Sequence, residues 1–151
     1  GKNVILGQNT FIGEGVIIGD NCKIQNNVSI YSGVVLEKDV FCGPSCVFTN
    51  VKLPRASIEQ KDQFLKTLVK RGSTIGANAT ILCGIEIGKF SFIGAGSNVI
   101  DDVKDYSLAY GNPAKHKSWV SEYGAKLNKK LICPISKKKF KLINKKLKAY
   151  D

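Results

Sequence analysis

The chain has 151 residues, of which 43% are hydrophobic and 15 are glycine, so it is long enough for one domain with a core and is not generally disordered. Its net charge of +11 lies mostly in residues 115–151, which hold twelve lysines against two acidic residues. The five cysteines lack the spacing of a zinc site, and no apolar run reaches the roughly 18 residues of a membrane span. With no signal-peptide pattern at its N-terminus, the protein is expected in the cytoplasm, without a metal.

A six-residue period runs through the first third of the chain. Two residues before each large apolar position stands a small or β-branched residue, and glycine often follows the large one. No helix has this period, but a short strand plus a turn does, and three such units form one triangular coil of a parallel β-solenoid. The large apolar positions are Leu6, Ile12, Ile18, Ile24, Ile30, Leu36, Cys42 and Phe48.

The period then stops, and a segment rich in charge follows, from residue 49 to residue 72: "TNVKLPRASIEQKDQFLKTLVKRG". Pro54 rules out a regular strand there. An insertion in a solenoid lies at one corner, and such insertions commonly form a binding surface. The segment has enough apolar residues to pack, so we expect an ordered flap over a neighbouring subunit.

The period returns with Ile75, Ile81, Ile87, Ile93 and Val99. The sequence therefore predicts an all-β fold, a parallel β-helix over residues 1–106 with an excursion loop over 49–72. Residues 107–151 are expected to be a short basic C-terminal extension. Its lysines form either a solvated face or a surface for an anionic polymer or membrane, but they lack the interleaved aromatic residues of a nucleic-acid site.

The repeats resemble the hexapeptide repeats of left-handed β-helix acyltransferases over roughly residues 3–105. Five further blocks occur in one order: "KIQNNVSIY" (23–31), "VFCGPSCVFTN" (40–50), "PRASIEQKDQF" (54–64), "TLVKRGSTIGANATILCG" (67–84) and "GNPAK" (111–115). Together they resemble N-acetyltransferases of nucleotide-linked 3-amino sugars. The resemblance implies acetyl-CoA as co-substrate, a homotrimer with sites between neighbouring subunits, and a role in surface polysaccharide (O-antigen) synthesis. The sugar nucleotide is either a UDP-2-acetamido-3-amino-2,3-dideoxyglucuronate or a dTDP-3-amino-3,6-dideoxyhexose.

The reaction does not require a histidine base. A sugar amine titrates near the α-amino value of about 8, so part of it is already the free nucleophile at neutral pH. The single histidine, His116, is expected to be a solvated residue of the basic extension. We assign catalysis to Asn50, whose amide can orient the amine, and to Glu59, which can hold the amine's proton or a hydroxyl. The alternatives are a turn-forming role for Asn50 and an exposed loop charge for Glu59.

The remaining site residues are implied by the resemblance. The substrate set is Gln25, Asn26, Asn27, Tyr31, Arg55, Lys61 and Lys70, in which the cations suit a pyrophosphate or carboxylate. The asparagines equally suit a structural ladder between coils. The CoA set is Gly76, Ala77, Gly94, Ala95, Gly111, Pro113, Ala114 and Lys115.

Two other functions remain open on the sequence. One is O-acetylation, or acylation of a different amino sugar, by the same fold. The other is a non-catalytic β-helix that binds an anionic polymer through its lysines.

Overall fold

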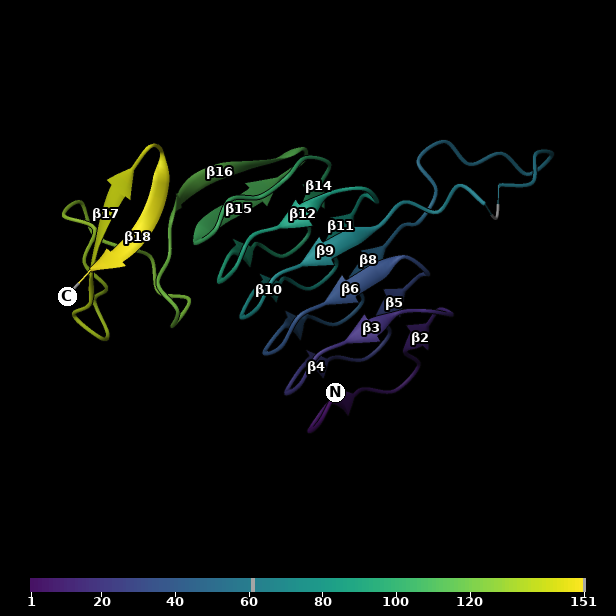
Figure 1. The fold of residues 1–151 in the computed structure, drawn as a ribbon, viewed down its shortest axis with the longest axis horizontal. Coiled ribbons are helices and arrows are strands. Elements are labelled where there is room, and N and C mark those ends of the chain that lie inside the picture. Colours follow the sequence, from purple (N-terminus) through teal and green to yellow (C-terminus); the bar gives the residue numbers. More distant parts are fainter. Residues whose placement is uncertain (61, 151) are drawn as a thin grey trace.

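A computed structural model describes residues 1–60 and 62–150 of the chain. These residues form strands and turns, stacked as the coils of a parallel β-helix (Figure 1). Among them, none forms a helix long and apolar enough to cross a membrane. The predicted all-β solenoid is confirmed.

Three sheets form the sides of the solenoid. Sheet A contains β1 (Ile5–Leu6), β4 (Lys23–Ile24), β7 (Phe41–Cys42), β10 (Thr74–Ile75), β13 (Phe92–Ile93), β15 (Ser107–Gly111) and β16 (Ala114–Trp119). Sheet B contains β2 (Phe11–Ile12), β5 (Ser29–Ile30), β8 (Val47–Phe48), β11 (Thr80–Ile81) and β14 (Asn98–Val99). Sheet C contains β3 (Ile17–Ile18), β6 (Val34–Leu36), β9 (Thr67–Val69) and β12 (Glu86–Ile87).

The register between strands explains the period. Ile24 pairs with Cys42, and Ile75 pairs with Ile93, so one coil takes 18 residues, or three units of six. The large apolar residues point inward and are fully buried from Ile24 onward, and the small positions Cys22 and Cys46 are buried among them. Stacking of identical positions therefore builds the core, as the sequence predicts.

Asparagine and aspartate shape one corner of the coils, between sheets C and A. Asn3, Asn21 and Asp39 stand in equivalent positions there, with φ of 56°, 59° and 63°. Their short polar side chains tolerate this left-handed conformation and form a ladder, in which Asn21 donates to Asp39 at 3.0 Å.

The excursion is shorter than predicted. β9 lies between β6 and β12, with Leu36 paired to Val69 across 33 residues, which is 15 more than a normal coil. Val69 takes the large inward position and Thr67 the small one, and both are buried. The coil therefore resumes at Thr67 rather than after Gly72. The sequence did not reveal this unit, because the unit at 67–72 has a lysine where glycine usually stands. The excursion projects away from the coils (Figure 1).

The basic extension after residue 106 is built of strands. β15 runs parallel to β13 and continues sheet A, and β16 turns back antiparallel to β15. Residues 120–150 form a small module that ends in a hairpin of β17 (Lys139–Ile143) and β18 (Lys146–Tyr150). Its own apolar core is Tyr106, Leu127, Cys133, Phe140 and Leu147.

Candidate active site

Asn50 stands where the chain leaves the solenoid, at the corner between sheets B and C. The backbone carbonyl of Asn50 accepts a hydrogen bond from the Leu65 N–H at 2.9 Å, and this bond closes the neck of the excursion. The hydroxyl of the preceding Thr49 accepts from the Cys83 N–H at 2.9 Å and ties the neck to the next coil. The side-chain amide of Asn50 is half-buried and makes no hydrogen bond within the described residues, so it is available to a substrate.

Thr49 is a positioning residue that the sequence reasoning missed. The sequence feature that could have identified Thr49 is its place directly before Asn50, where the six-residue period breaks. Tyr31 lies at the same corner one coil earlier, because β5 pairs in register with β8. The Tyr31 side chain is 41% exposed and lies against Phe11, with ring centroids 5.0 Å apart. The fold therefore gathers Tyr31 and Asn50 at one corner.

The excursion is held in shape by the Gln60 amide. Gln60 donates from Nε2 to the Leu53 carbonyl at 3.0 Å and accepts the Arg55 N–H at 3.2 Å. Arg55 also donates from its guanidinium to the Pro54 carbonyl at 3.1 Å. These hydrogen bonds link parts of the loop, which carries the exposed Arg55 and Glu59 outward. Lys61 lies outside the described residues.

Lys70 lies apart from the other predicted substrate residues. It follows β9 at the corner between sheets C and A, and its Nζ is 2.5 Å from Glu86 Oε1. The hydrogen bond that Lys70 donates to the Glu86 carboxylate raises the pKa of the Lys70 ammonium. The sequence did not reveal this ion pair, because residues 67–69 were expected in a loop, whereas they form strand β9 and place Lys70 beside the next coil.

Gln25, Asn26 and Asn27 lie at the corner between sheets A and B. Asn26 accepts the Gln8 N–H on Oδ1 at 3.0 Å, and Asn27 accepts from Asn9 Nδ2 at 3.3 Å. Asn27 also has a left-handed φ of 60°. The asparagines therefore form a ladder between coils, which the sequence left open as their alternative role. Both hydrogen bonds join Asn26 and Asn27 to the preceding coil.

The predicted CoA residues gather on this same corner, in successive coils. Gly76 and Ala77 precede Gly94 and Ala95 by one coil, since β10 pairs with β13 in register. A Cβ on Gly76 would lie 2.5 Å from the Ala95 backbone nitrogen, and one on Gly94 would lie 2.7 Å from Tyr110 Cβ. Close stacking thus requires glycine here, and it leaves a corner lined by backbone and methyl groups.

The turn from Gly111 to Lys115 completes the corner. Gly111 donates its N–H to Ser97 Oγ at 3.3 Å, and Asn98 donates to Asn112 Oδ1 at 3.3 Å. The fold therefore places Gly76, Ala77, Gly94, Ala95 and Gly111 along one edge of the solenoid, in three consecutive coils. Ala114 and Lys115 follow on β16 and line a cavity beside that edge.

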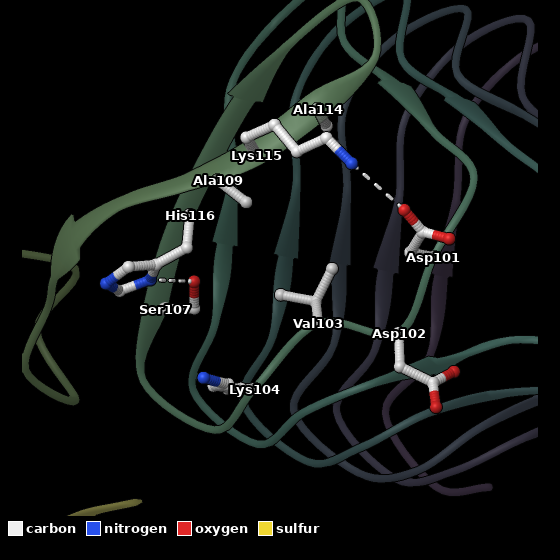
Figure 2. Close-up of a pocket in the computed structure, with 9 residues that line it drawn as sticks. All are labelled: Asp101, Asp102, Val103, Lys104, Ser107, Ala109, Ala114, Lys115 and His116. Carbon is white, nitrogen blue, oxygen red and sulfur yellow. Dashed lines mark hydrogen bonds and ion pairs between the residues drawn. The ribbon is translucent and has the colours of Figure 1, made fainter. Parts of the chain in front are cut away.

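A cavity of about 220 Å³ lies under β16 at the C-terminal end of the coils (Figure 2). Lys115 reaches across it to Asp101, with Nζ 3.1 Å from Oδ2. Both side chains are mostly exposed, so this ion pair contributes little stability and leaves the lysine free to exchange partners. Asp101 was not foreseen from the sequence.

His116 points from β16 toward Ser107 at the other end of this cavity (Figure 2). Its Nδ1 and Ser107 Oγ are hydrogen bonded at 2.7 Å, and its ring lies 4.5 Å from that of Trp119. Desolvation, followed by the charge of Lys104, lowers the pKa of the imidazole. His116 is exposed, as the sequence predicted, but it stands on strand β16 and is hydrogen bonded to Ser107 rather than lying in a tail without strands.

Two segments of the chain match known repeat families. Residues 3–38 match the bacterial transferase hexapeptide family (six repeats), and residues 71–100 match the hexapeptide repeat of succinyl-transferase. The two matches lie on either side of the excursion. Both matches show hexapeptide repeats in this chain that are similar to those of bacterial transferases.

Two curated relatives of this chain are acetyltransferases. The chain is 42% identical over 80 residues to dTDP-3-amino-3,6-dideoxy-alpha-D-galactopyranose 3-N-acetyltransferase of Aneurinibacillus thermoaerophilus, covering 51% of this chain and 42% of that protein. It is 40% identical over 81 residues to a serine acetyltransferase of Haemophilus influenzae, covering 54% of this chain and 28% of that one. The chain thus spans less than half the length of these relatives.

Solved structures share the fold of this hexapeptide-repeat protein. A hexapeptide-repeat acetyltransferase of Vibrio cholerae complexed with acetyl-CoA matches with a TM-score of 0.65 at 23% identity, over 80% of this chain and 72% of that one. A GDP-perosamine N-acetyltransferase variant of Caulobacter crescentus, in complex with CoA and GDP-perosamine, matches with a TM-score of 0.61 at 24% identity, over 78% and 52%. Within the described residues, no group of three or more histidine, cysteine or acidic side chains could hold a metal ion.

Proposed function

We propose that this chain transfers an acetyl group from acetyl-CoA to the 3-amino group of a nucleotide-linked 3-amino sugar used for surface polysaccharide. The observation that carries the proposal is the single edge that holds Gly76, Ala77, Gly94, Ala95 and the turn from Gly111 to Lys115. Small side chains there leave room for an extended pantetheine arm. Exposed Lys115, at the end of the edge, suits a phosphate of CoA.

The substrate amine attacks the thioester carbonyl carbon, the carbon–sulfur bond breaks, and CoA leaves as the thiolate. The amine loses its proton to that thiolate or to water. Acetyl-CoA is already activated, so no acyl-enzyme is needed. The protein accelerates the reaction mainly by aligning amine and thioester, which can supply a large share of the rate enhancement.

Asn50 orients the amine through its side-chain oxygen in this proposal. Its anchored backbone favours that role, since the hydrogen bonds of Thr49 and Leu65 fix the neck of the excursion. Glu59 and Arg55 are carried by the excursion to a site on a neighbouring subunit. There they contact the proton of the amine and the pyrophosphate, respectively.

The proposed site uses two corners of the solenoid. Asn50 and Tyr31 lie between sheets B and C, whereas the CoA edge lies between sheets A and B. One side of a coil spans about six residues, or roughly 20 Å of extended chain, so one subunit does not bring the two corners together. Association into a homotrimer would juxtapose one corner of a subunit with another corner of its neighbour.

The direct test measures CoA thiol release with a panel of UDP- and dTDP-linked 3-amino sugars and their 3-hydroxy counterparts. Release that requires the amine supports N-acetylation, and release with the hydroxyl sugars alone would instead support O-acetylation. Absence of release with every sugar, together with absence of acetyl-CoA binding, would contradict the proposed function.

The CoA edge has its own test, by calorimetric binding of acetyl-CoA. Ala95 is exposed on that edge, so Ala95→Trp should weaken binding at least tenfold by filling the path of the pantetheine arm. Ala149→Trp, the same change at an exposed position of β18, is the control and should bind acetyl-CoA normally. Equal affinity in the two variants would place CoA elsewhere.

A further inference from the structure

The hairpin of β17 and β18 has one apolar face and one basic face. Opposite residues of an antiparallel pair share a face, and the faces alternate along each strand. Phe140 and Leu147 are buried in the core of the C-terminal module. The other face carries, by register, Lys139 with Tyr150, Lys141 with Lys148, and Ile143 with Lys146. All six of these side chains are exposed.

The basic face is unbalanced. The sequence from residue 123 to residue 150 holds ten lysines and no acidic residue. Of these lysines, only Lys138 forms an ion pair among the described residues, with Glu122 at 3.0 Å. Lys141 and Lys148 stand directly opposite each other, an arrangement that destabilises a strand pair. Bound anions would relieve this repulsion.

An aliphatic side chain accompanies the charges on the basic face, at one end of the hairpin. Ile143 is 37% exposed there, directly before a turn that contains Lys145, whereas Leu142 pairs with Leu147 on the opposite face. At the other end Lys141 Nζ lies 5.3 Å from the centroid of the Tyr150 ring, which places both on the basic face. Lys146 also borders a cavity with Lys70 and Glu86, so Lys139, Lys141, Lys145 and Lys148 are the better-exposed charges.

We propose that this hairpin docks on an anionic phospholipid surface through its basic face, with its lysines at the headgroups and Ile143 at the level of the headgroup–acyl boundary. A soluble polyanion or a nucleic acid would satisfy the lysines but would leave the aliphatic end in water. The interface of a bilayer accommodates both kinds of side chain. The hairpin lies at the far end of the solenoid from the first coil (Figure 1), so docking leaves the coils accessible. The proposal is independent of the acetyl-transfer reaction.

Co-sedimentation of the full chain with lipid vesicles tests this proposal. Binding to vesicles of equal parts phosphatidylcholine and phosphatidylglycerol should exceed binding to pure phosphatidylcholine and should weaken as salt rises. Replacing Lys141 and Lys148 together by Glu should weaken binding about tenfold or more, since each lysine near an anionic surface contributes a similar increment. Lys129→Glu with Lys130→Glu changes the net charge equally and lies off the hairpin, so it should have a clearly smaller effect.

Two further variants keep the test decisive. Lys141→Glu alone creates a cross-strand pair of opposite charges, which preserves the hairpin, and it should still weaken vesicle binding. Ile143→Ser should weaken binding to vesicles but leave binding to an oligothymidylate and to dextran sulfate unchanged. Equal loss in the Lys129 and Lys130 control would overturn the proposal. So would vesicle binding that ignores Ile143→Ser, which would indicate a soluble polyanion or nucleic acid.

Discussion

At the scale of single residues, Asn50 combines a fixed backbone with a side-chain amide that is available to a substrate. Its backbone is held by the hydrogen bond to Leu65, while its amide stays available. The alternative was a turn-former whose side chain caps backbone groups, and among the described residues the bond across the neck comes from the backbone carbonyl instead. The side chain and the backbone bond can therefore be separated by changing the side chain alone.

Asn50→Ala should reduce kcat by about 5- to 150-fold and change the acetyl-CoA affinity much less. Loss of one oriented hydrogen bond in a desolvated site costs about 1–3 kcal/mol, while the backbone bond that closes the neck remains. Steady-state kinetics with the identified sugar and calorimetric binding of acetyl-CoA provide the two readouts.

His116→Ala is the matched comparison for catalysis and should lower kcat far less. Without a histidine base, the rate should rise with pH as the substrate amine deprotonates, so a sugar amine of different pKa should shift the profile. An inactive His116→Ala protein beside a fully active Asn50→Ala protein would contradict this mechanism.

The pH dependence of stability gives a separate readout for His116. Desolvation lowers the pKa of the folded imidazole below its ordinary value, so the unfolded chain binds the proton more readily. This contribution to stability is complete above the ordinary pKa of about 6.5 and is lost as pH falls through the lower, folded value. Urea unfolding of the parent should therefore show a loss of stability in that window, and His116→Gln should show less of it.

Identical pH profiles for the parent and His116→Gln would show that His116 titrates alike in both states. Ser107→Ala probes the same imidazole from its partner's side, because the buried Ser107 Oγ is hydrogen bonded to His116 Nδ1.

At the scale of the elements, the close stacking of coils limits which side chains fit at their corners. Gly76→Ala should lower the free energy of unfolding by about 1–3 kcal/mol, because its Cβ would lie 2.5 Å from the backbone of the next coil, which can only shift as a whole. Ala77→Ser, the next residue on the same corner, is the control and should change stability by less than about 0.5 kcal/mol. Chemical denaturation of the two variants measures both. A Gly76→Ala protein as stable as the parent would mean that successive coils yield readily.

The period of six predicted the coils well because each inward position repeats a local pattern. It also predicted that Gly76 and Gly94 would align, since 18 residues make one coil. The return of the excursion at Thr67 was missed because the unit at 67–72 lacks the usual glycine. The C-terminal strands were missed although Phe140 and Leu142 alternate with lysines, a period-two signal overshadowed by the charge.

The site was predictable only where it follows the coils. Spacing alone places Gly76, Ala77, Gly94 and Ala95 in equivalent positions of successive coils, but it does not place Gly111–Lys115. It also carries no information about an excursion whose shape depends on Gln60 bridging its two limbs. The partner of Lys70 required the register of β9 against β12, which no local pattern reveals.

At the scale of the whole molecule, the outer faces of the first coil are apolar. Ile5, Phe11 and Ile17 lie on sheets A, B and C and are 55%, 48% and 60% exposed. Apolar side chains on several flat sides favour association with further protein. Together with the separation of the Asn50 corner from the CoA edge, they favour a site shared between subunits.

A mixing experiment distinguishes a shared site from one within a single chain. Asn50→Ala and Ala95→Trp each impair one half of the proposed site, so at acetyl-CoA concentrations below saturation each protein alone should be much less active than the parent. In a homotrimer with random exchange of equal amounts, about one quarter of the interfaces pair an intact Asn50 corner with an intact CoA edge, and activity should recover to about that fraction. Native mass spectrometry of one tagged and one untagged subunit verifies that exchange has occurred. Exchange without recovery would show that both halves belong to one chain, and a stable monomer at micromolar concentration in sedimentation would exclude the shared site altogether.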